Sequence, residues 1–226
     1  MFQSIEPLSK SKHKELKIQP VKSFDFARNL TSVPLSYREI LKASRYYPIV
    51  FSANEAPTPL ALLSVNKEGN AFIDSDGNWT ASYIPLHIRR YPFILGQTDQ
   101  EDSFVVCIDP EAPHFSTDQG EPLYTEEGEG TDMLNRATEY LKQFHQEMVT
   151  TQQMFQALDG KEIFREKRMT IGRGDKQEAA ISGFKTVDTK VLNGLDNETL
   201  GTWVKQGIMG LVYAHLHSFD NIKAMA

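Results

Sequence analysis

The stretch of sequence that decides the fold is TDMLNRATEYLKQFHQEMVTTQQMFQAL, residues 131–158. Its core-forming residues return every three or four positions, which is the spacing that places side chains on one face of an α-helix. The opposite face is polar and charged, so we predict a long amphipathic helix that covers a sheet. The residues of the buried face are Leu134, Ala137, Leu141, Phe144, Met148, Thr151 and Phe155.

The segment before this helix, residues 31–110, is rich in short strands and contains an apparent repeat. SRYYPIVF at 44–51 and IRRYPFIL at 88–95 share an arginine, a Tyr-Pro pair and an apolar triplet. Each is followed by a second apolar run, at 61–65 and 104–108. We therefore expect two similar hairpins that pair into one antiparallel sheet.

Two local signals mark the ends of elements in this segment. Ser36 and Glu39 form a capping box, which predicts that a short helix begins at Tyr37. DSDGN at 74–78 predicts a tight turn, because Asp and Asn accept local backbone hydrogen bonds and Gly77 tolerates positive φ. The turn resembles the start of a calcium loop, but the remaining ligands of such a loop are missing from the sequence.

The chain after the long helix predicts one hairpin and two helices. The glycines of MTIGRGD at 169–175 predict the hairpin turn. A helix capped by Asp196 and an almost entirely apolar helix at 208–218 follow. Together these features predict an α+β fold, an antiparallel sheet of hairpins with a long amphipathic helix and a C-terminal helical pair. The expected organisation is an extended N-terminal arm (1–30) and a single domain (31–226), with a duplicated strand-hairpin half (31–110), an acidic loop (111–132) and a helical half with one hairpin (133–226).

Composition and charge exclude several classes of protein. The chain has 226 residues, 40% apolar and 24% charged, with a net charge of −6, which argues against nucleic-acid binding. Its one cysteine, Cys107, lies in an apolar strand, where we expect it to pack in the core rather than act as a nucleophile. The N-terminus lacks the apolar stretch of a signal peptide, and no apolar run approaches the ~20 residues that span a bilayer. We therefore expect a cytosolic protein without membrane insertion.

The negative charge is concentrated between Asp99 and Asp132, where eleven acidic residues occur without any Lys or Arg. The simplest interpretation is a solvated acidic loop. The alternatives are a docking surface for a basic partner and a weak site for a divalent cation.

Arg89, Arg90 and Tyr91 are the strongest binding candidates, because two guanidinium groups beside aromatic rings can hold a carboxylate or phosphate. The alternative is that these arginines pair with the acidic stretch. Arg45 and Tyr47 stand at the corresponding positions of the first repeat and are weaker candidates.

The last apolar helix contributes two further binding candidates, Tyr213 and His215. We also expect His215 to be hydrogen-bonded in the core. His217 and Asp220 are three residues apart and can share one face, so they are an alternative metal site that needs a third ligand. We expect no bound cofactor.

Several motifs follow one another along nearly the whole chain. They are SVPL (32–35), YPIVF (47–51), RRYPF (89–93), CID (107–109), GEPL (120–123), Val187-Asp188 and LVYAHL (211–216) with Ser218 and Asn221. In this order they resemble the SapC family. The resemblance implies an accessory role, because genes of this family neighbour TonB-dependent receptors, tryptophan halogenases and cupin-like proteins. The family name implies a link to bacterial surface layers. His217 and Asp220 replace apolar residues of many relatives, so the resemblance gives neither a family role.

We therefore predict a non-enzymatic cytosolic binding or accessory protein that recognises a peptide or protein partner, linked to TonB-dependent uptake or tryptophan-halogenase systems. One alternative is an enzyme that modifies a peptide or small molecule with a metal held by His215 or His217. The other is a structural protein associated with a surface layer.

Overall fold

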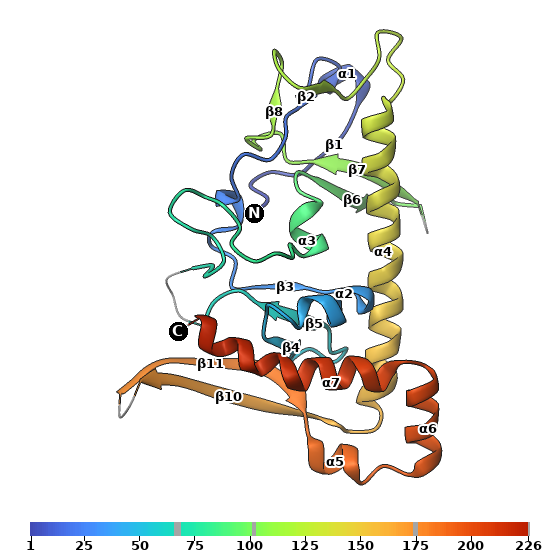
Figure 1. Cartoon of the computed structure of the whole chain (residues 1–226). Helices are drawn as coiled ribbons and strands as arrows, with labels where there is room; N and C mark the ends of the chain where they lie inside the picture. The colour runs from blue at the N-terminus through green and yellow to red at the C-terminus, as the bar shows by residue number, and fades with distance from the viewer. Residues whose placement is uncertain (66–68, 101–102, 174–175, 226) are drawn as a thin grey trace.

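The computed structural model describes residues 1–65, 69–100, 103–173 and 176–225. The molecule is elongated, and the helix α4 (Asp132–Asp159) runs along most of its length (Figure 1). Thr131 caps α4 by accepting a hydrogen bond from the amide of Leu134. The α+β fold with a long helix and a C-terminal helical pair is confirmed.

The other helices and strands are short except for one hairpin near the C-terminus. The helices are α1 (Lys10–His13), α2 (Tyr37–Ala43), α3 (Leu86–Arg89), α5 (Thr189–Asn193), α6 (Asn197–Lys205) and α7 (Ile208–Ser218), with 3-10 turns η1 (Asp25–Ala27) and η2 (Phe219–Met225). The strands are β1 (Glu6–Pro7), β2 (Lys17–Ile18), β3 (Ser32–Pro34), β4 (Ile49–Ser52), β5 (Pro59–Leu62), β6 (Phe93–Gln97), β7 (Phe104–Ile108), β8 (Phe115–Ser116), β9 (Glu121–Pro122), β10 (Phe164–Arg173) and β11 (Lys176–Val187).

The main sheet is antiparallel, with the strand order β10-β11-β4-β5-β3. The predicted hairpin around residues 169–184 is confirmed as β10 and β11, although residues 174 and 175 of its turn lie outside the described residues. The hairpin extends away from the rest of the molecule beside α7 (Figure 1).

The two repeat hairpins do not share one sheet, contrary to the prediction. β4 and β5 belong to the main sheet, whereas β6 and β7 form a second sheet with the order β1-β7-β6. The reason is that other strands occupy both edges of the first hairpin, so neither edge is open to β6 or β7. β11 and β3 flank the first hairpin, and β1 from the N-terminal arm pairs with β7 of the second.

Apolar side chains form a large cluster around the main sheet and a small cluster around β6, β7 and the first half of α4. The helix α4 joins the two clusters, because it supplies Leu134 and Leu141 to the small one and Phe155 to the large one. Phe51 of β4 contacts the rings of Phe155 and His215, so α4 and α7 pack on the same side of this strand. No helix within the described part of the chain combines the length and apolar composition needed to cross a membrane.

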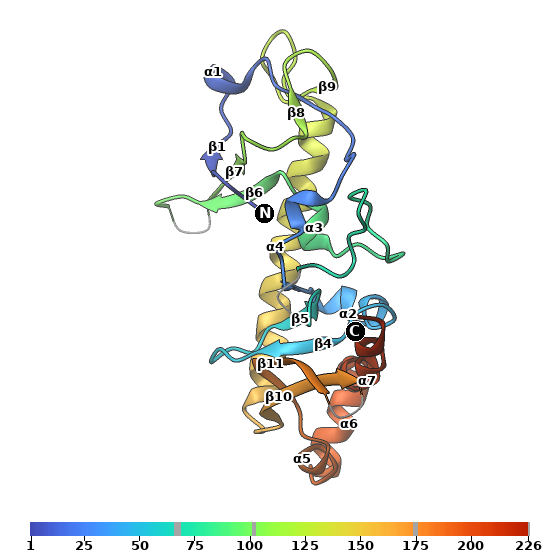
Figure 2. The ribbon, with the colours of Figure 1, turned by 90° about the vertical axis from the view of Figure 1, so that its left-hand side faces the viewer.

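The N-terminal arm, residues 1–30, passes over the end of the molecule that carries β8 and β9 (Figures 1 and 2). Strand β2 of the arm pairs with both β8 and β9. The Nζ atoms of Lys10 and Lys17 donate to the carbonyl oxygens of Glu127 and Asp118, at 2.7 and 3.2 Å. The acidic stretch is thus held in part by the lysines of the arm. Glu101 and Asp102 of that stretch lie outside the described residues.

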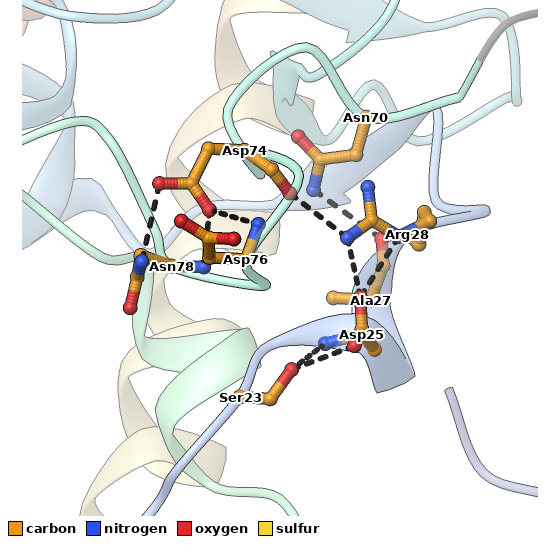
Figure 3. Close-up of polar contacts among 8 residues, drawn as sticks. All are labelled: Ser23, Asp25, Ala27, Arg28, Asn70, Asp74, Asp76 and Asn78. Carbon is orange, nitrogen blue, oxygen red and sulfur yellow. Dashed lines mark hydrogen bonds and ion pairs between the residues drawn. The ribbon is translucent and has the colours of Figure 1, made fainter.

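The arm then packs against the turn at 74–78, which forms as predicted (Figure 3). The Asp74 carboxylate accepts the amides of Asp76 and Asn78, at 2.9 and 2.8 Å. Arg28 of the arm donates to the Asp74 carbonyl oxygen at 3.0 Å. Gly77 has φ +82°, and a Cβ atom there would lie 2.2 Å from the Oγ of Ser23. Backbone amides of the turn therefore occupy one oxygen of the Asp74 carboxylate, and the arm packs against the turn.

Candidate functional site

A cavity of about 780 Å³ lies between the arm, the end of α3 and the first half of α4, and we call it the arm pocket. Most of its lining is apolar, with a small number of charged and aromatic groups. The residues that line it are 18–21 of the arm, Arg89, Arg90, Tyr91, Phe93, His114, Gly120, Glu121, Met133, Arg136, Ala137, Tyr140 and Leu141.

Helix α3 is held in place by the buried carboxylate of Glu39, which belongs to α2. Glu39 is part of the predicted capping box and accepts the amide of Ser36 at 2.9 Å. It also accepts the amide of Leu86, at the start of α3, at 2.7 Å and the hydroxyl of Tyr83 at 2.8 Å. The hydroxyl of Tyr140, on α4, donates to the Leu86 carbonyl at 3.2 Å. These contacts fix the position of α3, and the end of this helix places Arg89 and Arg90 at the pocket.

Arg90 is the half-buried cation of the arm pocket. Its guanidinium lies over the rings of Phe2 and Phe144, with its Cζ atom 5.7 and 5.3 Å from their centroids. Its Nε atom is buried, and within the described chain the side chain has neither an ion pair nor a hydrogen-bond acceptor. Burial lowers the pKa of Arg90 to about 10, so the group still carries its charge at neutral pH.

Tyr91 connects the pocket to the arm. Its ring stacks on Phe26 at 4.3 Å and its hydroxyl donates to Asp109 at 3.1 Å. Asp109 is fully buried and also accepts the amide of Gln3 at 2.9 Å. Burial is the main cause that raises the pKa of the Tyr91 hydroxyl, with the neighbouring Asp109 second. Tyr91 is therefore a neutral donor that helps to order the wall of the pocket.

His114 is a second buried polar group on this wall, and sequence reasoning did not identify it. Its side chain is 4% exposed and lies edge-on to the rings of Tyr91 and Phe26, at 5.2 and 5.3 Å. Neither ring nitrogen has a hydrogen-bond partner among the described residues. Burial lowers the pKa of His114. No local pattern marks this histidine, because its position on the wall depends on long-range packing.

Arg89 and Arg136 differ from Arg90 in their surroundings. Arg89 is exposed and its Nε donates to the Ile84 carbonyl at 3.1 Å. Arg136 lies 3.5 Å from the Glu121 carboxylate in an exposed ion pair. Within the described residues, Arg89 and Arg90 form no ion pair with the acidic stretch, so these residues give no support to the interpretation that the two arginines hold it. Arg136 pairs with Glu121 of the stretch, and lysines of the arm donate to its backbone carbonyls.

The structure brings Arg89, Arg90 and Tyr91 together at the pocket and places the other binding candidates elsewhere. Tyr47 is fully buried in the large cluster, where its hydroxyl donates to the Tyr83 carbonyl and accepts from the Trp79 indole. Arg45 is exposed at the end of α2 and does not line the arm pocket.

His215 is fully buried and hydrogen-bonded in the core, as expected. Its Nδ1 donates to the Ile49 carbonyl at 2.8 Å and its Nε2 accepts the Val187 amide at 3.1 Å. Burial lowers the pKa of His215 to about 4. Both ring nitrogens are thus used by the backbone. Tyr213, two residues earlier on α7, is 50% exposed on its outer surface.

His217 and Asp220, the alternative metal ligands, are both exposed. Within residues that the structure describes, no group of three His, Cys, Asp or Glu side chains is arranged to hold a metal ion. Cys107 is buried in β7, and burial raises the pKa of its thiol.

Comparison with known proteins identifies the family of the chain. The profile of the SapC family matches residues 8–225, which is nearly the whole sequence. A search of curated proteins found no match, and a search of solved structures found none either. The match covers the arm from residue 8 onward and all the residues that line the pocket. The chain therefore belongs to the SapC family.

Proposed function

We propose that the protein is a non-enzymatic, cytosolic accessory protein that binds a peptide or protein partner in the arm pocket. The observation that carries this proposal is the Arg90 guanidinium, a half-buried cation without a carboxylate partner in the described chain, on the wall of a mostly apolar cavity. Burying a charge without a partner costs free energy, so such a group is favoured where a ligand supplies the partner.

The size and lining of the pocket support this function. Binding sites for small ligands and for single side chains of a partner are concave, apolar cavities of roughly 300–1,000 Å³ with a few placed polar groups. The arm pocket has this character, with Phe93, Met133 and Leu141 among its apolar walls. Val21 of the arm is 46% exposed at its edge and offers apolar surface to a larger partner.

The proposal also takes up the association with TonB-dependent uptake or tryptophan-halogenase systems that the family resemblance implies. In that setting, the protein would hold a peptide or protein for another component. A metal-assisted enzyme built on His215 is less well supported, because the backbone already uses both of its ring nitrogens. No contact described above favours a surface-layer role.

The proposal is tested with the full chain and a synthetic library of random heptapeptides. We expect enrichment of a consensus peptide, and loss of its binding when Ala137→Trp fills the pocket from α4. The control is Gln152→Trp at an exposed position of the same helix, which is expected to bind as the native protein does. Equal binding by both variants would contradict the pocket as the site. Turnover of an enriched peptide by the purified chain would contradict the non-enzymatic role.

A further inference from the structure

We infer that the arm pocket recognises a carboxylate attached to an apolar group, with the Arg90 guanidinium as the counter-ion. This inference rests on the proposed function and names the chemical class that the pocket selects. The charge of the lining, the surroundings of Arg90 and the unpartnered ring of His114 support it.

The charges that line the pocket do not balance. Glu121 supplies the carboxylate among the described lining residues, and Arg136 already faces it at 3.5 Å. Arg89 and Arg90 remain as cations without an acidic partner in the described chain. A ligand that restores neutrality in this cavity is therefore an anion.

The surroundings of Arg90 favour a carboxylate over a larger or more highly charged group. Its Cζ atom lies over the rings of Phe2 and Phe144, which supply apolar and aromatic surface but no acceptor oxygen. The N–H groups of a guanidinium form a fork that matches the two oxygens of a carboxylate. Arg89 is exposed, so solvent screens its charge, and Arg90 is the cation that the ligand must neutralise. One such partly buried cation matches a single negative charge, whereas a phosphate carries nearly two.

His114 indicates the same kind of ligand independently. Its buried ring has two nitrogens without partners in the described chain, on the wall that Tyr91 shares with it. A neutral imidazole carries one N–H donor, and an unsatisfied buried donor is costly. A ligand that brings an acceptor oxygen to this wall satisfies the N–H donor of His114, which the protein itself leaves unsatisfied. The remaining lining, with Met133, Ala137 and Leu141, accommodates an apolar group.

The first test compares acetyl-Phe-Leu with a free carboxyl end, its C-terminal amide, and acetyl-Phe-Glu-Leu amide by isothermal titration calorimetry. We expect the native chain to bind the free acid or the Glu peptide roughly tenfold or more tightly than the Phe-Leu amide. Tighter binding of the free acid indicates a terminal carboxylate, and tighter binding of the Glu peptide indicates a side-chain carboxylate. Arg90→Met should abolish that preference. The control Arg38→Met removes another arginine that lies over an aromatic ring, outside the pocket, and should preserve it. Equal binding of acid and amide by the native chain, or tighter binding of a phosphoserine analogue, would overturn the inference.

A second test does not depend on peptide binding or on the folding of a variant. Phenylacetate, but not phenylacetamide, is expected to shift the Nε–Hε resonance of Arg90 in NMR spectra of the native chain. If the peptides fail to bind while phenylacetate shifts this resonance, the peptide-binding function is wrong and the carboxylate inference stands. If phenylacetate leaves the resonance unchanged, the carboxylate inference is wrong whatever the peptides do.

Discussion

At the scale of single residues, the buried polar groups differ in whether the protein satisfies them. The Glu39 carboxylate accepts three hydrogen bonds, and both ring nitrogens of His215 are bound to the backbone. These groups stabilise the packing of helices on strands. Arg90 and His114 lie in the same molecule without such partners in the described chain. The contrast separates residues that hold the fold from the residues that we propose contact a ligand.

His215 makes the stability of the protein depend on pH. Its pKa falls from 6.5 to about 4 on folding because burial penalises the charged ring. Because the folded protein binds this proton less readily than the unfolded chain, the free energy of unfolding is highest above pH 6.5. It decreases as the pH falls from 6.5 towards 4. The loss amounts to roughly 2–4 kcal/mol of unfolding free energy. Urea denaturation between pH 7 and pH 4 measures it.

The variant that isolates this effect is His215→Gln, because an amide side chain can both donate to Ile49 and accept from Val187 without titrating. Its unfolding free energy should depend less steeply on pH than that of the native chain. The exposed His217→Gln is the matched control and should keep the native slope. The remaining slope of the variant belongs to other histidines, such as the half-buried His87, whose pKa burial lowers to about 3, with Arg90 a smaller cause. A native slope in His215→Gln would contradict this assignment.

At the scale of elements, the turn at 74–78 and the arm form one unit. The turn brings Gly77 against Ser23, the Phe24 amide donates to the Gly77 carbonyl at 2.8 Å, and Arg28 reaches the Asp74 carbonyl (Figure 3). The position of the arm therefore depends on a backbone conformation that glycine adopts most readily. Because residues 18–21 of the arm line the pocket, the turn also supports the site.

Gly77→Ala should loosen the arm, because the added Cβ atom meets the Ser23 side chain and the residue must keep a positive φ. We expect a loss of about 1–2 kcal/mol in the free energy of unfolding and faster tryptic cleavage after Lys22 and Arg28. Thermal unfolding and limited proteolysis measure the two effects. Gly201→Ala, in the middle of α6 with open space around it, should instead stabilise the protein by about 0.5–1 kcal/mol. If both substitutions change the free energy of unfolding in the same direction, the conformation of Gly77 does not explain the effect of Gly77→Ala.

Element-scale signals were predictable from the sequence where they are local. The 3–4 periodicity of α4, the Ser36–Glu39 capping box and the turn at 74–78 all depend on residues close together in the chain, and each forms as predicted. The division of the repeat hairpins between two sheets was not predictable in this way. It depends on which distant strands, β11 and β1, reach the hairpin edges, and short strands carry little information about such pairing.

The candidate site was predictable in part for the same reason. Arg89, Arg90 and Tyr91 stand next to one another in the sequence and were identified as a group. The absence of an acidic partner for Arg90 in the described chain, and the presence of His114 on the same wall, follow from tertiary packing alone. The lysines of the arm and the acidic stretch were both visible in the sequence, but their contact joins segments about a hundred residues apart.

At the scale of the whole molecule, α4 connects two apolar clusters that otherwise have separate sheets (Figure 2). Its first half completes the small cluster and one wall of the arm pocket, and its second half packs on the main sheet through Phe155. The geometry of the pocket therefore depends on a helix whose far end is fixed in the large cluster.

Gln146→Pro should uncouple the two clusters. Gln146 is exposed between the two halves of α4, and proline there removes a helical hydrogen bond and clashes with the preceding turn, at a cost of roughly 3 kcal/mol. Differential scanning calorimetry should show two separate unfolding transitions for the variant and a single one for the native chain. Gln146→Ala should unfold in a single transition at or above the native temperature. A single transition in the proline variant would show that contacts other than α4 couple the clusters.

The pairing of the arm with β7 also sets the order in which the protein can mature. The Gln3 amide bonds to Asp109, a partner 106 positions away, and the Lys17 side chain reaches residue 118. During synthesis, the arm must wait until these partners have been made, and closing so long a loop is slow and entropically costly. The cavity is consequently completed late, after the helix that forms its opposite wall has been translated. A nascent chain stalled before that point contains the N-terminal segment but lacks the α4 residues that line the cavity.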